Sequence, residues 1–106
     1  MIQYISTRGP GAPKTSLDVM LAGLAPDGGL YVPDMWPEID FEMMRHLSGA
    51  PYTLIAANVM TPFIGKSLSP SVLQQLLIDT YSIRNFNHTA VAPLTQIGPG
   101  AWVLEL

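Results

Sequence analysis

The sequence has no cysteine and little charge, and both shortages exclude kinds of site. Without cysteine there is no disulfide, no thiolate metal ligand and no cysteine nucleophile. Charged residues make up 12% of the 106 residues, with five basic and eight acidic side chains. That is about half the usual charged share. No basic stripe stands out among them, so nucleic-acid binding is not predicted.

Long apolar runs and targeting segments are also missing. No stretch approaches the roughly 20 consecutive apolar residues of a membrane span. Residues 1–4 contain no charged segment followed by an apolar run, so no secretion signal is predicted. We therefore expect no membrane partner and a cytoplasmic location. Asn87-His88-Thr89 fits the glycosylation sequon, and without a secretion signal we interpret the match as chance.

Apolar residues are plentiful, at 48% of the chain. A chain of this length fits one small domain, which we place over residues 1–106. Much apolar and little charged surface suggests that part of the domain lies against other protein. An ordinary Met- and Leu-rich small domain explains the same composition, and composition alone leaves both interpretations open.

Two helices are predicted in the first half of the chain. The first follows Thr15, which has Asp18 three residues later in a capping-box arrangement, and it ends near Gly23. A short second helix begins after Asp40, a typical cap residue. Apolar residues at the helical period form the predicted buried face of the first helix: Leu17, Met20, Leu21 and Leu24.

Two further helices are predicted in the second half. One begins near Pro51, a favourable first helical residue, and the other after Ser69, a cap residue followed by Pro70. Their predicted buried faces are Tyr52, Ile55, Ala56, Val59, Met60 and Phe63 in one helix and Leu73, Leu76, Leu77 and Tyr81 in the other.

Short strands are predicted at residues 3–6, 30–32 and 101–106, while residues 9–13 and 85–100 are predicted as loops. The sum is an α/β or α+β domain of three to four helices with a few short strands. Trp36 and Trp102 are expected to be packing anchors.

No complete catalytic group is evident. Gly9 to Lys14 resembles a phosphate-binding loop, but Pro13 stands where the pattern needs glycine, and proline removes a backbone donor. His46 and His88 lie far apart without spaced partners, so no metal site is predicted. We assign no catalytic, cofactor-binding or metal-ligating residue.

Two short stretches remain as candidates for function. Ser6, Thr7 and Arg8 place two hydroxyls and a guanidinium together, and guanidinium geometry suits phosphate. The alternative is a solvated or carboxylate-paired Arg8, which we prefer on local grounds. Asp27-Gly28-Gly29 reads as a tight turn, since glycine reaches positive φ without steric cost.

The same stretches carry a family resemblance. Tyr4-Ile5-Ser6-Thr7-Arg8-Gly9, followed by LAGLAPDGGLYVP over residues 21–33, resembles the opening of threonine synthase. Weaker similarity extends through Ala90-Val91-Ala92-Pro93-Leu94 and Trp102-Val103-Leu104-Glu105-Leu106. It covers nearly the whole chain in the right order.

The resemblance implies the amino-terminal domain of a pyridoxal-phosphate enzyme of fold type II. That enzyme converts O-phosphohomoserine and water into threonine and phosphate. In the family, the lysine that binds the cofactor lies in a Phe-Lys-Asp segment beyond a Leu-Glu-Leu-like run. Neither Lys14 nor Lys66 has such a context, so we expect the chain to be cut off before that lysine and to be inactive alone.

The partners implied are the catalytic domains of the parent enzyme, with no cofactor in this chain. In one hypothesis, Ser6, Thr7 and Arg8 lie near the phosphate-bearing substrate. In another, the domain is purely structural. A threonine-synthase-like phospho-lyase with a different substrate and a free-standing interaction module remain alternatives.

Overall fold

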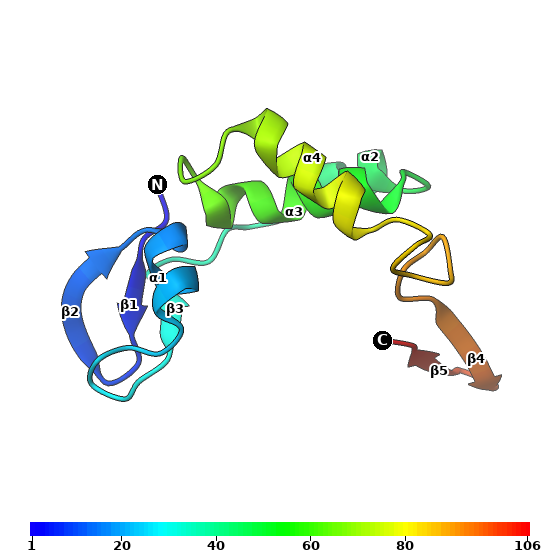
Figure 1. Cartoon of the computed structure of the whole chain (residues 1–106). Coiled ribbons are helices and arrows are strands. Elements are labelled where there is room, and N and C mark those ends of the chain that lie inside the picture. Colours follow the sequence, from blue (N-terminus) through cyan, green and yellow to red (C-terminus); the bar gives the residue numbers. More distant parts are fainter.

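The chain forms three parts in succession, shown in the computed structural model of Figure 1. The structure describes residues 1–106, except for the side chain of Pro10. A small sheet with one helix comes first, three helices follow, and a hairpin comes last. The elements are β1 (Tyr4–Ser6), β2 (Gly9–Lys14), α1 (Ser16–Ala22), β3 (Tyr31–Pro33), α2 (Phe41–Leu47), α3 (Tyr52–Ile64), α4 (Pro70–Thr80), β4 (Leu94–Gly98) and β5 (Ala101–Leu104). This mixed arrangement of four helices and two small sheets confirms the predicted fold class.

The first sheet has the order β2-β1-β3, and both pairings are antiparallel. Tyr4 lies opposite Lys14 on one side and Pro33 on the other. The predicted loop at residues 9–13 is therefore wrong, because these residues form most of β2. An edge strand tolerates proline, since one of its two sides makes no ladder hydrogen bonds.

The predicted capping box begins α1. Thr15 Oγ1 accepts a hydrogen bond from Asp18 N at 3.2 Å, and Thr15 N donates to Asp18 Oδ2 at 3.1 Å. The two bonds satisfy backbone donors that have no partner inside the helix. Gly23, with φ of 73°, ends the helix.

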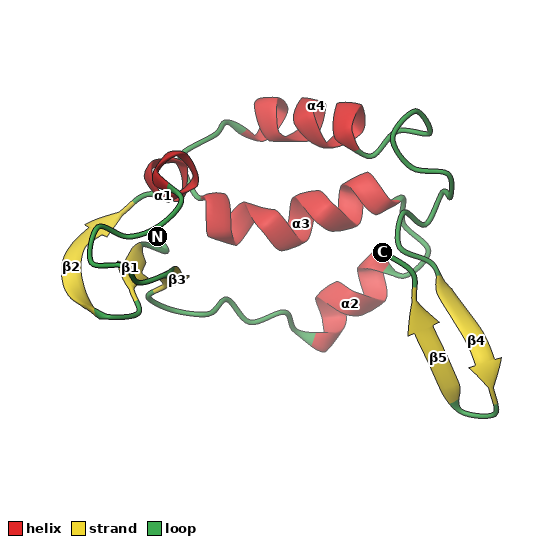
Figure 2. Ribbon diagram, turned by 60° about the horizontal axis from the view of Figure 1, so that its bottom comes forward, coloured by secondary structure: helices red, strands yellow, loops and turns green.

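Helices α2, α3 and α4 form the second part, and α3 and α4 pack side by side (Figure 2). Asp40 caps α2 and Ser69 caps α4, each through its side-chain oxygen, as predicted. Leu73 and Leu77 of α4 are buried. Aromatic rings close one end of this layer: Tyr52 with Tyr81 at 4.8 Å, and Tyr81 with Phe86 at 5.5 Å.

Two hydroxyls join the sheet unit to the end of α3. Tyr4 Oη donates to the Phe63 carbonyl at 3.0 Å, and Ser16 Oγ donates to the Ile64 carbonyl at 2.9 Å. These carbonyls lie in the last turn of α3, where backbone acceptors lack helical partners. The hydroxyls therefore fix the helix end and attach the two parts to each other.

The third part is the β4–β5 hairpin, which projects away from the helices (Figures 1 and 2). Residues 101–106 were correctly predicted to contain a strand, but β4 falls inside the predicted loop at residues 85–100. The two strands are antiparallel, with Leu94 opposite Leu104 and Thr95 opposite Val103. All four β5 residues are exposed.

Little of the apolar surface is buried within the chain. The buried apolar residues are Ile2, Ala25, Leu73 and Leu77. The radius of gyration is 16.6 Å, against about 13 Å for a compact domain of this size. The predicted buried face of α1 is wrong within this chain, since Leu21 is 80% exposed. Low charge and open apolar surface together are typical of a surface that packs against other protein.

The tryptophans differ from the expectation of packing anchors. Trp36 makes an edge-to-face contact with Phe63 at 6.2 Å but is 73% exposed. Trp102 is 56% exposed. Neither ring is enclosed by other residues of this chain. Among the described residues, no helix has the length and apolarity to cross a bilayer.

Removing the cap of α1 should weaken the sheet unit. We expect Thr15→Ala to lower the free energy of unfolding by about 1 kcal/mol, because the N-terminal amides of α1 lose their acceptor. Urea unfolding of the parent chain and of the Thr15→Ala variant measures the difference in free energy. Thr80→Ala, an exposed change at the end of α4, is the control; an equal loss in both variants would contradict the capping role.

Candidate functional site

The loop between α1 and β3 turns tightly around Asp27, Gly28 and Gly29. Gly28 N donates to the Ala25 carbonyl at 2.9 Å, and Ala25 N donates to the Gly29 carbonyl at 3.0 Å. Gly28 has φ of 80°, a conformation that is costly for residues with a Cβ. The backbone of this loop thus makes its own closed set of hydrogen bonds.

Side chains from the end of β1 hold this loop in place. Asp27 Oδ1 accepts from Ser6 Oγ at 2.8 Å and from Gly29 N at 2.8 Å. Thr7 and Leu30 bond reciprocally: Leu30 N donates to Thr7 Oγ1 at 3.0 Å, and Thr7 N donates to the Leu30 carbonyl at 2.8 Å. We call these bonds, formed by Ser6, Thr7, Asp27, Gly29 and Leu30, the loop clasp.

Gly29 has no space for a side chain. A Cβ at this position would overlap Ser6 Oγ and would lie 3.0 Å from Asp27 Oδ1 and 3.1 Å from Thr7 Oγ1. Gly29 itself is buried. Glycine is therefore required at this position by close packing of the three side chains of the clasp.

Arg8 lies at the outer side of the clasp and is exposed. Its backbone N donates to Ser6 Oγ at 3.2 Å, and its Nη1 donates to the Asp27 carbonyl at 3.4 Å. A Cβ at Gly28 would lie 3.1 Å from Arg8 Nη1. The guanidinium thus rests on the glycine turn and has further donors facing solvent.

The clasp favours the ionised form of Asp27. Its pKa is lowered from 3.8, first by the hydrogen bond from Gly29 N and then by the bond from the Ser6 hydroxyl. Both donors stabilise a negative oxygen and lose strength when the carboxyl is protonated. Asp27 acts here as an acceptor for the Ser6 hydroxyl and the Gly29 amide, an arrangement that by itself indicates no catalytic role.

Beside the clasp is an open pocket of about 330 Å³. Its polar lining comes from Ser6, Lys14, Asp27 and Tyr31, and the rest is backbone and small residues: Gly11, Ala12, Ala25 and Pro26. The pocket joins β1, β2 and the loop before β3. Its acidic and basic groups, Asp27 and Lys14, belong to different elements.

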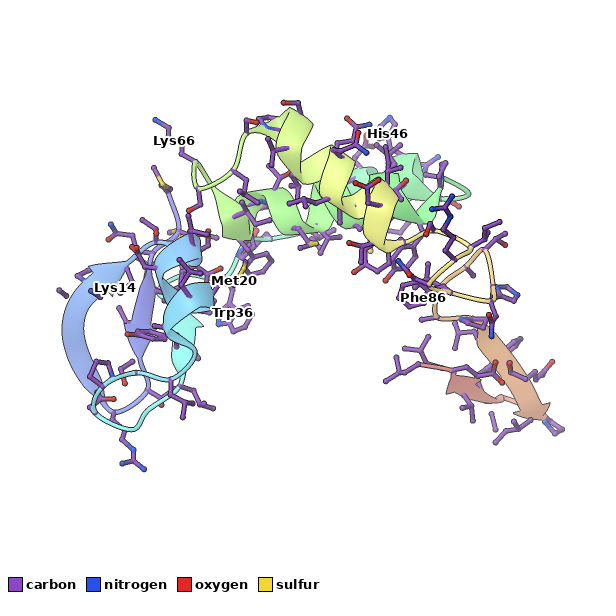
Figure 3. The ribbon with its side chains drawn as sticks, viewed as in Figure 1. Lys14, Met20, Trp36, His46, Lys66 and Phe86 are labelled. Carbon is purple, nitrogen blue, oxygen red and sulfur yellow. The ribbon has the colours of Figure 1, made fainter. Side chains whose placement is uncertain are left out.

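A larger, mostly apolar groove of about 540 Å³ lies between the sheet, α1 and the end of α3. Its lining includes Met20, Leu30, Met60 and Phe63. Met20 lines this groove, and Trp36 contacts Phe63 of the same lining; Met20 and Trp36 are both labelled in Figure 3. Apolar side chains without covering neighbours are typical of a surface that packs against protein.

Other titratable residues do not gather into a site. Among the described residues no group of three or more His, Asp and Glu side chains is placed to bind a metal. His46 Nδ1 contacts the Glu42 carbonyl at 2.9 Å, and Ala90 N donates to His88 Nδ1 at 3.0 Å. Each histidine therefore makes a local contact within its own segment. Lys14 lies in β2 and Lys66 in the turn that follows α3 (Figure 3).

The structure brings together residues that the sequence discussed separately. Ser6, Thr7 and Arg8 were candidates for substrate contact and Asp27, Gly28 and Gly29 for a turn, yet both sets form one cluster. Ser6 and Asp27 are 21 positions apart in the sequence, which hides this contact from local patterns. The only signal in the sequence is that both stretches carry the family resemblance.

Comparisons with known proteins all match this chain to threonine synthases and their relatives. A family model described as "Threonine synthase N terminus" matches residues 3–81. The threonine synthase of Pseudomonas aeruginosa is 45% identical over 105 residues, covering 99% of this chain. Threonine synthase-like 2 of Mus musculus is 38% identical over 104 residues, covering 97% of it.

A solved structure matches as well. The crystal structure of PLP-bound threonine synthase from Brucella melitensis is 38% identical, with a TM-score of 0.91 over 99% of this chain. The chain spans only 22% of that protein and of the Pseudomonas relative, and 21% of the mouse relative. The matching region is therefore about one fifth of each longer protein.

Filling the space at Gly29 should disrupt the clasp. We expect Gly29→Ala to lower the free energy of unfolding by about 1–3 kcal/mol, because the new methyl group displaces Ser6 and Thr7. Gly11→Ala is the matched control, since a Cβ there meets nothing within 4 Å. Thermal unfolding distinguishes them; equal stability of the two variants would contradict the packing argument.

The clasp should also weaken in acid. Because the pKa of Asp27 is lower when folded than its ordinary value of 3.8, its contribution is complete above that value and is lost as pH falls through the lowered pKa. We expect Asp27→Asn to show a shallower loss of stability between about pH 5 and 2 than the parent chain. Asp18, whose pKa the Thr15 hydroxyl lowers, still responds in both. Identical pH profiles would exclude the Asp27 contribution.

Proposed function

Because the chain belongs to the threonine synthase N-terminal domain family, we propose that it serves as the amino-terminal domain of a threonine synthase. The proposed parent enzyme converts O-phosphohomoserine and water into threonine and phosphate in the cytoplasm, as part of threonine biosynthesis. The observation that supports this most directly is the full-length structural match to one fifth of a PLP-bound threonine synthase.

We propose that the cofactor is bound outside residues 1–106. Pyridoxal phosphate supplies an electron sink when a protein lysine and a phosphate cup orient it. The residues present do not fit that requirement. Lys14, in β2, and Lys66, in the turn after α3, are both exposed. The glycine-containing clasp already uses its backbone donors internally. This chain therefore contributes no step that passes through the cofactor.

The residues of this chain support a role in packing against the catalytic domains and in shaping the substrate cleft. Open apolar surface on α1 and in the groove beside it supports docking against the catalytic domains of the same enzyme. The clasp fixes the end of β1 and thereby the position of Arg8. The 38% identity to threonine synthase-like 2 keeps a related phospho-lyase as the second candidate, and the substrate that is turned over decides between them.

A joined enzyme tests the proposal. This chain replaces the matching amino-terminal segment of the Pseudomonas aeruginosa relative, and phosphate and threonine are measured after addition of O-phosphohomoserine. We expect kcat/KM within about tenfold of the relative, corresponding to a change of roughly 1.4 kcal/mol in transition-state stabilisation. An inactive joined enzyme that still binds pyridoxal phosphate would contradict the proposal.

Two controls accompany that assay. The relative without its amino-terminal segment should lose activity, because the apolar surface that the segment covers becomes exposed. The pure 106-residue chain should release no phosphate. Phosphate release by the isolated chain would overturn its predicted inactivity, and threonine formation without the segment would show that this domain is dispensable.

Arg8 is the residue of this chain that we place nearest the phosphate-bearing substrate. Its guanidinium has donors free of the clasp, and such donors suit phosphate oxygens. We expect Arg8→Ala in the joined enzyme to raise KM for O-phosphohomoserine about tenfold or more. Arg45→Ala, at an exposed position in α2, is the control. An unchanged KM with lowered thermal stability would assign Arg8 to the clasp alone.

A further inference from the structure

The outer edges of the two sheets differ in their ability to accept another strand. In the first sheet the outer strand β2 contains Pro10 and Pro13, and the other outer strand, β3, ends at Pro33. Proline has no N–H to donate to a neighbouring strand. Proline in edge strands is a common protection against unwanted strand pairing. The β4 and β5 segments contain no proline.

The two strands of the hairpin also differ in composition. In β5 both faces are apolar, with Ala101 and Val103 on one and Trp102 and Leu104 on the other. Strands of this kind lie inside sheets, with both faces covered. The partner β4 carries a polar residue on each face, Thr95 and Gln96, which is typical of an edge strand. Composition therefore places β5 between two neighbours, whereas within the described residues it has one.

The register identifies which backbone groups are free. Glu105 N donates to the Pro93 carbonyl at 2.9 Å, so the backbone groups of Glu105 face β4. Groups in a strand alternate in direction, and Thr95 lies opposite Val103; Val103 thus also faces β4. The N–H and C=O groups of Trp102 and Leu104 consequently point to the open edge of β5.

We propose that the open edge of β5 receives an extended strand from the catalytic part of the same enzyme, which makes β5 an interior strand of the catalytic sheet. This inference rests on the proposed function, because it takes the occupant from the four fifths of the relatives' length that this chain does not span. An isolated two-stranded hairpin is marginal in water. Main-chain hydrogen bonds to Trp102 and Leu104 would fix the register of the domain on its catalytic partner.

The same arrangement separates two modes of contact. The proline-containing first sheet contacts other protein through the side chains of its apolar groove, while the hairpin contacts it through backbone hydrogen bonds. A second copy of this chain, pairing edge to edge through β5, is the competing occupant. The two differ in whether occupancy of the edge depends on protein concentration.

Hydrogen exchange in the joined enzyme tests this directly. We expect the Trp102 and Leu104 amides to exchange at least about tenfold more slowly than the Leu94 and Gln96 amides, which point outward from β4. The difference should be independent of protein concentration. Equal exchange at all four positions, protection of the β4 amides instead, or protection that rises with concentration would each overturn the proposal.

A matched pair of substitutions supplies a second measurement. Leu94 and Leu104 lie opposite each other in the register, and both have outward-facing backbone groups. Leu104→Pro removes a donor to the proposed strand and should lower activity of the joined enzyme at least about tenfold. Leu94→Pro should retain activity. Equal effects of the two changes would contradict the assignment to β5.

Activity measured on the same samples separates this inference from the proposed function. If the joined enzyme forms threonine while the Trp102 and Leu104 amides exchange freely, the strand pairing is wrong and the proposed function stands. If those amides are protected in a joined enzyme that forms no threonine, the proposed function fails and the strand pairing stands.

Discussion

One carboxylate oxygen holds the amino-terminal unit together. Asp27 Oδ1 accepts hydrogen bonds from the Ser6 hydroxyl at the end of β1 and from the Gly29 amide two residues before β3. The separation of these two segments is set by that shared acceptor. It leaves no space for a Cβ at Gly29, and it fixes the backbone on which Arg8 rests. Ser6 and Asp27 also form part of the lining of the pocket beside the clasp, and the Arg8 guanidinium donates to the Asp27 carbonyl.

Features with a local cause were predictable from the sequence. Thr15, Asp40 and Ser69 cap their helices because each side chain bonds the backbone amide three residues later. Strands β1, β3 and β5 were predicted near their observed positions, since β-forming residues and turn residues define them. The family resemblance was recognisable because its motifs lie in continuous stretches of sequence, and the comparisons confirm it.

Features that depend on distant contacts were not predictable. The prolines of residues 9–13 argued for a loop, yet pairing with β1 makes them a strand. The apolar side of α1 has the correct period for burial, but no element of this chain covers it. Val91 has φ of 61°, which is unfavourable for a β-branched residue and has no local sequence signal. The hydrogen bond between Ser6 and Asp27 was likewise not predictable, because the two residues are 21 positions apart in the sequence.

The two hydroxyl bonds to the end of α3 have a consequence for the order in which the chain folds during synthesis. Tyr4 and Ser16 emerge from the ribosome long before their acceptors, since the bonds span 59 and 48 residues. The strands of the first sheet are all available once Pro33 has emerged, whereas Ile64 follows roughly 2–6 s later at ordinary rates of translation. During that interval both hydroxyls bond to water. The α3 residues that line the apolar groove, Met60, Phe63 and Ile64, are not yet in place. The amino-terminal unit of the nascent chain is thus at its most exposed before α3 is complete.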